Sequence, residues 1–320
     1  MSERILITGG AGYIGSNIAA ALSTRPGTDV LVVDDFSSAD WRNLIHVDCE
    51  VRAADCNDAA LLAEIADGAF SAIFHQAAIT DTTVMDQRLM VEVNTNAFAD
   101  ILKASAASGT RVTYASSAGT YGNSPAPNCV GQGEIPENIY GFSKLAMDRV
   151  AYRWHDRHAA PIIGLRYFNV FGPGESHKNE RDGNKTASMI LQLYEHVKSG
   201  KQPRLFKYGE QKRDFVYIRD VISANLATLD APRSGVCNVG SGIARSFNDI
   251  VNNLALLLDK ELNIEYFDNP FSFYQEHTEA DLNESEKVLN WQPEWPLEAG
   301  MKDYITLLES GHRGPVESKP

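Results

Sequence analysis

The chain has 320 residues, 43% of them hydrophobic and 22% charged, which is typical of a globular protein that buries a large core. A formal net charge of −13 disfavours nucleic acid and anionic membranes as partners, although an anionic sugar nucleotide can still bind at local cations and helix N-termini. The four cysteines show no ligand spacing, so no metal site is predicted, and the lack of a leader or a long apolar run predicts a cytoplasmic protein.

Short apolar segments alternate with helical patterns along the first half of the chain. The expected strands are residues 4–7, 30–33, 72–75 and 111–115, and the expected helices are residues 14–22, 59–65 and 89–107. This alternation predicts an α/β fold with a doubly wound parallel sheet of the Rossmann type.

The second half begins with an amphipathic helix expected over residues 138–155 and a strand over 161–167. Residues 175–185 are polar and predict a loop over a site, followed by elements at 186–199, 212–220 and 236–239 and by a disordered tail of ten residues. We expect a dinucleotide-binding Rossmann domain over residues 1–172, with later returns near 213–240, and a smaller C-terminal α/β substrate-binding domain over 173–320.

The segment Ile5-Leu-Ile-Thr-Gly9-Gly-Ala-Gly12-Tyr-Ile-Gly15 places glycines between the first strand and the first helix. Glycine is needed there for a tight turn, for close approach of the backbone to a pyrophosphate, and for packing of the helix on the strand. Glycines alone fit an ordinary turn, but the strand, helix and second strand around them predict a dinucleotide site. Asp34 ends that second strand, where a carboxylate accepts hydrogen bonds from the adenosine ribose.

Asp34 also bears on the choice of cofactor. A carboxylate repels the 2′-phosphate of NADP unless a cation compensates, and Arg42 is the only close candidate in the sequence. NAD is therefore favoured, and NADP stays open.

Tyr140 and Lys144 lie one helical turn apart, so both project from one face of the helix expected over residues 138–155. A base must take the proton of a substrate hydroxyl while hydride leaves its carbon, and a phenol is protonated at neutral pH because its ordinary pKa is about 10. The Lys144 ammonium would lower that pKa, and Ser116 at a strand tip could hydrogen-bond the same oxygen. Alone the pair fits an idle surface position; after the glycine segment it predicts nicotinamide chemistry.

These motifs resemble the extended short-chain dehydrogenase/reductase family of sugar-nucleotide enzymes, the NAD-dependent epimerases and dehydratases. The similarity is carried by Ser116, Tyr140-x-x-x-Lys144, Arg166-Tyr-Phe-Asn-Val-Phe-Gly-Pro173 and Arg213-Asp-Phe-Val-Tyr-Ile-Arg-Asp220. Residues 75–83, 114–122, 177–178, 186–189 and 273–275 are similar to the branch that epimerises an ADP-heptose at C6. Ala118 and Gly119 supply no acid–base pair, which disfavours a dehydratase.

The resemblance implies a mechanism. The C6 hydroxyl of the heptose is oxidised with tightly bound NAD or NADP, and the resulting ketone turns and takes hydride back on its other face. Acid–base groups are then needed on two sides of the carbon, and Tyr140 and Lys178 match these positions. Read without the family, Lys178 is a lysine in a polar loop, where most lysines are solvated.

The resemblance also implies the remaining binding residues. Its cofactor positions are Gly9, Gly12, Tyr13, Ile14, Gly15, Asp34, Asp35, Arg42, Asp55, Gln76, Ala77, Ala78, Ile79, Thr80, Asn94, Lys144 and Val170. Its substrate positions are Ser116, Asn169, Lys185, Gln192, Phe206, Lys207, Tyr208, Gly209, Arg213 and Tyr274. Arg213 suits a bidentate clamp on the ADP phosphates, whereas core packing is the alternative for Phe206 and Tyr274.

Two alternatives to this function stay open, and the sequence differs from the family pattern at one place that bears on them. The first is a 4-epimerase of a hexose nucleotide, which needs one tyrosine, and the second is a nucleotide-sensing protein without chemistry. Residues 179–184 form a longer link after Lys178 than some family members have, which could reposition that lysine. The resemblance further implies a homo-oligomer.

Overall fold

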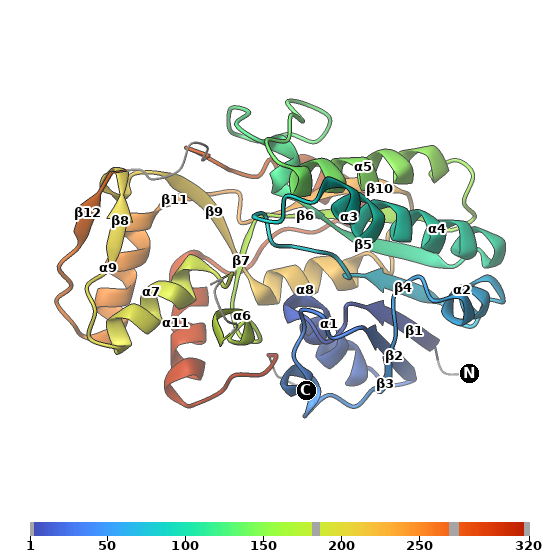
Figure 1. The fold of residues 1–320 in the computed structure, drawn as a ribbon, viewed down its shortest axis with the longest axis horizontal. Helices are drawn as coiled ribbons and strands as arrows, with labels where there is room; N and C mark the ends of the chain where they lie inside the picture. The colour runs from blue at the N-terminus through green and yellow to red at the C-terminus, as the bar shows by residue number, and fades with distance from the viewer. Residues whose placement is uncertain (1–2, 181–185, 269–274, 317–320) are drawn as a thin grey trace.

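The computed structural model describes residues 3–180, 186–268 and 275–316. A seven-stranded sheet with the strand order β10-β6-β5-β4-β1-β2-β3 forms its centre, and every neighbouring pair is parallel (Figure 1). The strands are β1 (Glu3–Thr8), β2 (Thr28–Asp34), β3 (Glu50–Ala53), β4 (Ala72–His75), β5 (Arg111–Ser117), β6 (Ile162–Tyr167) and β10 (Gly235–Val239). The predicted Rossmann sheet is confirmed, although β3 was not expected from the sequence.

Helices cover both faces of this sheet, as its apolar strands require. On one face lie α2 (Ala59–Ala66), α4 (Ala97–Ser108) and α5 (Ile139–Trp154), and on the other lie α1 (Tyr13–Ser23) and α8 (Ile218–Ala227). The strand order reverses at β1, which pairs with β2 on one side and β4 on the other. The crevice at the carboxyl ends of these strands is where such folds bind nucleotides.

A second group of elements lies beside the sheet, at the left of Figure 1. It holds a three-stranded sheet of β11 (Ala244–Ser246), β9 (Lys212–Tyr217) and β7 (Asn169–Phe171), and a pair of β12 (Glu265–Phe267) and β8 (Arg204–Phe206). Its helices are α6 (His177–Glu180), α7 (Met189–Lys198), α9 (Phe247–Leu258) and α11 (Leu297–Glu309), whereas α10 (Asn283–Leu289) packs against β10 of the central sheet. One apolar cluster runs from Ile163 and Leu165 of the central sheet into α7, α9 and α11.

The helix expected over residues 89–107 is divided in the structure. It consists of α3 (Gln87–Val91), a π-helical turn (Glu92–Asn96) and α4. The buried Asn94 lies in that turn and bonds the backbone of Ile79, so a contact distant in sequence accompanies the change in winding. Apolar periodicity alone does not reveal such a turn, because a π turn shifts the pattern by one residue.

The expectation of a disordered tail is wrong for residues 311–316. Val316 is 4% exposed, packs in the main apolar cluster, and donates its backbone N–H to Asn17 Oδ1 at 2.8 Å. Val316, the last residue that the structure describes, therefore lies beside α1. Burial of a single apolar side chain fixes a segment whose composition is otherwise that of a loop.

Candidate functional site

The glycine segment forms a cradle at the end of β1. Gly9 has φ +66°, and a Cβ there would lie 2.5 Å from the backbone N of Ala77, so only glycine fits. A Cβ on Gly15 would meet the carbonyl oxygen of Gly9. Gly12 is the N-cap of α1 and makes no side-chain cap, which leaves the first N–H groups at Tyr13 and Ile14 open to a ligand. These donors fit the pyrophosphate of a dinucleotide.

Two carboxylates follow at the end of β2. Asp34 is 6% exposed, and it accepts hydrogen bonds from the backbone N–H of Ala11 at 3.0 Å and of Phe36 at 2.9 Å. Burial raises the pKa of Asp34, while these N–H groups oppose the shift. Asp35 beside it is exposed, and so is Asp55 after β3. Asp34 thus holds the glycine segment, and the ribose edge of the cradle is acidic.

Arg42 is held by two carboxylates in this structure. Its guanidinium lies 2.6 Å from Asp40 and 2.5 Å from Glu180 of α6. These hydrogen bonds raise the pKa of Arg42 above its ordinary value. Two anionic partners neutralise the cation, which makes it a poor receptor for a 2′-phosphate.

The segment after β4 continues the cradle. Gln76 donates its backbone N–H to Thr8 at 2.9 Å, and its side chain accepts from the Tyr167 hydroxyl at 3.2 Å. Asn94 bonds both the N–H and the carbonyl of Ile79, at 2.8 and 3.0 Å. The expected cofactor positions Ala77, Ala78 and Thr80 lie in this same segment. Val170, another expected position, lies in β7. The backbone of 76–79 is therefore fixed by contacts at both its ends.

Tyr140 and Lys144 lie in the first turns of α5, which Asn138 caps through a hydrogen bond from Gly141 N at 2.8 Å. Lys144 Nζ lies 5.9 Å from the centre of the Tyr140 ring and donates to the carbonyl of Ala115 at 2.8 Å. Burial lowers the pKa of Lys144 to about 8, against the opposing charge of Asp148.

The Tyr140 phenol is half-buried, and burial raises its pKa, while a hydrogen bond with Ser117 opposes that shift. A phenolate at this position therefore needs additional positive charge or donors from bound ligands.

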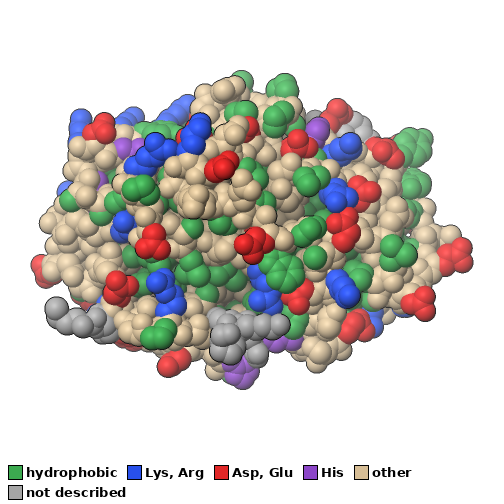
Figure 2. Space-filling model, turned by 180° about the vertical axis from the view of Figure 1, so that it is seen from behind, with side chains coloured by type: hydrophobic (Ala, Val, Ile, Leu, Met, Phe, Trp, Pro, Cys, Tyr) green, Lys and Arg blue, Asp and Glu red, His purple; other side chains and the backbone are tan. Residues whose placement is uncertain are grey.

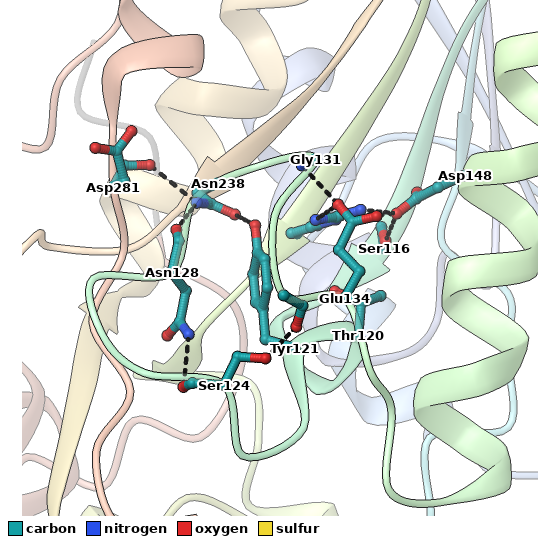
Figure 3. Close-up of polar contacts among 12 residues, drawn as sticks. Ser116, Thr120, Tyr121, Ser124, Asn128, Gly131, Glu134, Asp148, Asn238 and Asp281 are labelled. Atoms are coloured by element: carbon teal, nitrogen blue, oxygen red, sulfur yellow. Dashed lines mark hydrogen bonds and ion pairs between the residues drawn. The ribbon is translucent and has the colours of Figure 1, made fainter.

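Ser116, near the end of β5, is buried in the structure. Its Oγ donates to Asp148 at 3.1 Å (Figure 3). Asp148 also accepts from Tyr114 at 2.9 Å and from Arg166 at 2.8 and 2.9 Å. Successive residues of a strand point to opposite faces, so Ser116 shares the buried face of Tyr114. The neighbouring Ser117 points the other way and contacts Tyr140.

Ser117 is therefore a residue that the sequence reading missed. Its Oγ accepts from the backbone N–H of Gly119 at 3.0 Å, and its side chain acts to lower the pKa of Tyr140. The alternation of side chains along β5 was the available signal, because it places Tyr114 and Ser116 on one face and Ser117 on the other.

Lys178 lies in α6 against the first turn of α1. Its Nζ is 5.4 Å from the centre of the Tyr13 ring, and the side chain is half-buried. Burial lowers the pKa of Lys178, and the carboxylate of Glu175 opposes that shift. Glu175 is 1% exposed and accepts from the backbone N–H of Ser188 at 2.6 Å and its hydroxyl at 2.7 Å. Lys178 is thus neither solvated nor remote from the nucleotide cradle.

The expected substrate positions fall in the second group of elements. Tyr208 is 74% exposed at φ +58°, and its ring centre lies 5.7 Å from that of Tyr266. Phe206 packs edge-on against Phe267 at 5.9 Å, so this position combines packing with partial exposure. The other described positions are the exposed Asn169 in β7, Gln192 in α7, Gly209 at φ +68° and Arg213 in β9.

Three expected positions carry less structural information. Lys185 and Tyr274 lie outside the described residues, and only the backbone of Lys207 is described.

In the described ranges no group of His, Cys, Asp and Glu could hold a metal ion. No helix in that part of the chain is long and apolar enough to span a bilayer. On the face seen in Figure 2, basic side chains are interspersed with acidic ones.

Residues 5–240 match the family model described as the NAD dependent epimerase/dehydratase family. A protein of Cupriavidus pinatubonensis (strain JMP 134 / LMG 1197) named ADP-L-glycero-D-manno-heptose-6-epimerase is 36% identical, over 96% of this chain and 99% of that protein. The Helicobacter pylori ADP-L-glycero-D-manno-heptose-6-epimerase structure matches with a TM-score of 0.89 and 43% identity, over 97% of each chain. MoeE5 in complex with UDP-glucose and NAD matches with a TM-score of 0.81 and 26% identity, over 96% of this chain and 99% of that one.

Proposed function

We propose a reaction from the premise that this chain belongs to the NAD dependent epimerase/dehydratase family. The chain is an isomerase that interconverts ADP-D-glycero-D-manno-heptose and ADP-L-glycero-D-manno-heptose at C6, in the supply of heptose for the lipopolysaccharide core. The observation that carries this proposal is the placement of Lys178 on Tyr13, because a second acid–base group beside the cradle is what inversion by two proton-transfer groups requires.

The chain's own residues divide the work in this proposal. Bound NAD supplies the oxidation and re-reduction of C6 by accepting and returning hydride. Tyr140 exchanges the proton of the C6 hydroxyl on one side, and the Lys144 ammonium and the Ser117 hydroxyl favour its phenolate. Lys178 exchanges the proton on the other side, since its lowered pKa brings it closer to the pH at which it can both take and give a proton.

The proposed cofactor site is the cradle of glycines, the acidic edge at Asp34 and Asp35, residues 76–80, and Asn94, Lys144 and Val170. NAD is preferred over NADP, because Asp35 is exposed at the ribose edge and Arg42 is neutralised by Asp40 and Glu180. Cofactor extraction followed by mass spectrometry of the purified protein tests this preference.

The proposed substrate site lies on the second group of elements. Tyr208 and Tyr266 present a pair of exposed rings to which a planar adenine can stack. Arg213 is assigned to the diphosphate, as a planar guanidinium suits a bidentate contact. Residues 1–172 with later returns near 213–240 form the proposed cofactor domain, and 173–320 the substrate domain.

A homo-oligomer in the cytoplasm is the proposed state of the chain. Light scattering on purified protein tests the assembly, and fractionation of cells tests the location.

The deciding experiment is NMR of the purified protein incubated with ADP-D-glycero-D-manno-heptose and no added nicotinamide. We expect the L-glycero epimer to appear, which also shows that the cofactor stays bound through purification. No conversion, with or without added NAD or NADP, contradicts the proposed substrate.

A further inference from the structure

A buried asparagine joins the segment before Lys178 to the glycine cradle. Asn43, in the 3-10 turn Trp41–Leu44, is 4% exposed. Its Nδ2 donates to the carbonyl of Ala11 at 3.1 Å and of Gly174 at 3.2 Å, and it lies 3.3 Å from His177 Nδ1. One carboxamide therefore contacts the nucleotide cradle and the residue next to Lys178.

Asn17 of α1 also joins the cradle to the segment before α6. It is fully buried, and its Nδ2 donates to the carbonyl of Tyr13 at 2.9 Å and of Pro173 at 3.0 Å. Its Oδ1 accepts the backbone N–H of Val316. Both asparagines thus bond one carbonyl of the cradle and one carbonyl just before α6, and we call the pair Asn17 and Asn43 the asparagine clasp.

An ion pair between Arg42 and Glu180 runs beside the clasp at the surface. Both side chains are half-exposed, at 50% and 52%, so water screens this contact. The clasp is shielded from water, and breaking it would remove buried hydrogen bonds from the carbonyls of Ala11, Pro173 and Gly174. The clasp, more than the ion pair, fixes the distance between the two segments.

The placement of Lys178 depends on this backbone. Among the described residues, no carboxylate lies within ion-pair distance of its Nζ, and the contact that places the ammonium is with the Tyr13 ring at 5.4 Å. The clasp bonds the carbonyl of Tyr13 and the chain before Lys178 at the same time. We propose that Asn43 and Asn17 are positioning residues that hold Lys178 in register with the nucleotide cradle.

This inference rests on the proposed role of Lys178. It predicts that loss of the clasp slows the oxidation of one epimer more than that of the other. Tyr140 and Lys178 serve opposite faces of C6, so loss of Lys178 should slow the oxidation of one epimer more than that of the other. Loss of the clasp should slow the same epimer, by about tenfold, because misplacing a reacting group has costs of that size or more. A general folding or cofactor defect would slow both epimers.

The test compares Asn43→Ala, Lys178→Met and a matched control in single-turnover reduction of the bound cofactor by each epimer, followed by absorbance. The control is Asn253→Ala, which removes a carboxamide that donates to Asp249 O at 3.0 Å within α9. We expect Asn43→Ala to share the epimer selectivity of Lys178→Met and Asn253→Ala to behave as the unaltered chain. If Lys178→Met is selective, the positioning role of Asn43 is overturned when Asn43→Ala slows cofactor reduction by both epimers equally or by neither. A non-selective Lys178→Met overturns the proposed role of Lys178 itself.

Hydrogen exchange supplies a readout that needs no turnover. In the cofactor-bound protein without substrate, amides of residues 174–180 should exchange faster in Asn43→Ala than in Asn253→Ala. Asn43→Asp keeps the shape of the side chain and removes its donors, so it replaces Asn43→Ala if that variant does not fold. Unchanged exchange in residues 174–180 contradicts the positioning role.

Discussion

At the scale of single residues, the phenol of Tyr140 is the group whose removal is most diagnostic. Tyr140→Phe deletes one oxygen and keeps the ring that lies beside Lys144. We expect turnover to fall by a factor of about 100 or more, because general acid–base catalysis contributes about that much. The rate of epimerisation by NMR, together with the bound cofactor content, checks this. Retained turnover removes Tyr140 from the mechanism.

Ser116 and Ser117 form a matched pair at one strand end. Ser117→Ala removes the hydroxyl that contacts the phenol, so we expect a lower kcat with little loss of stability. Ser116→Ala removes a donor to the buried Asp148, so we expect about 1 kcal/mol lower stability and a nearly unchanged kcat. Steady-state kinetics and urea unfolding of both variants distinguish the two roles. The opposite pattern would restore Ser116 to the site.

Cofactor choice is also decided by single charges. Asp40→Asn keeps a side chain that can cap the 3-10 turn but removes one of the two carboxylates on Arg42. We expect the affinity for NADP relative to NAD to rise about three- to tenfold, which corresponds to about 1 kcal/mol. Competition binding to the cofactor-free protein measures the ratio. No change in that ratio means that Arg42 does not face the 2′ position.

At the scale of elements, α5 is joined to the sheet by a buried charge pair. Arg166 of β6 and Asp148 of α5 are both fully buried, and Glu134 lies 2.6 Å from the same guanidinium. Asp148→Asn leaves a buried cation with one partner fewer, so we expect a loss of about 3–5 kcal/mol in stability. Thermal and urea unfolding measure it. A loss below about 1 kcal/mol would show that Glu134 alone satisfies Arg166.

The same helix carries a pH-dependent contribution. The pKa of Lys144 is about 8 in the folded chain and near 10.5 ordinarily, so the unfolded chain binds more protons between these values. The contribution of Lys144 to stability therefore rises as the pH increases from about 8 to 10.5, and below 8 it is constant and unfavourable. Comparison of the unaltered chain with Lys144→Met by urea unfolding across this range isolates the effect. A difference that is flat with pH contradicts the lowered pKa.

The sequence predicted the elements that have a long apolar pattern and missed those that depend on distant contacts. Strands such as Ala72–His75 were located because four apolar or half-apolar residues in a row need burial on both faces. Three-residue strands such as Arg204–Phe206 and Glu265–Phe267 are too short to show an alternating apolar pattern. They are strands because they pair with each other. The hydrogen bond from Ser116 to Asp148 gave no local signal for a related reason, because the two residues are 32 positions apart in the sequence.

The candidate site shows the same division. The glycines, Tyr140 and Lys144 were predicted because their spacing has a local physical meaning. Asn43 and Asn17 gave no local signal, since a carboxamide in a turn or helix is ordinary until a distant carbonyl lies beside it. Lys178 was predicted only through family resemblance.

At the scale of the whole molecule, Val316, the last residue described, belongs to the core. Val316 buries its side chain and bonds Asn17 of the clasp. A chain ending at residue 314 should lose about 2–3 kcal/mol from one apolar side chain and one hydrogen bond. Urea unfolding measures the loss, and a chain ending at residue 316 is the control. Equal stability of the two would show that the docking of Val316 is not needed.

The order in which the sheet is completed has a consequence for synthesis. Strand β6 lies between β5 and β10, and all six of its residues are buried, yet β10 is encoded about 70 residues later (residues 162–167 against 235–239). While the ribosome makes that intervening stretch, β6 is an apolar edge with unpaired backbone groups, the kind of surface that pairs with other chains. Nascent chains on one polysome are therefore exposed to mutual aggregation during this interval, and a slow ribosome between residues 168 and 234 should lower the yield of folded protein.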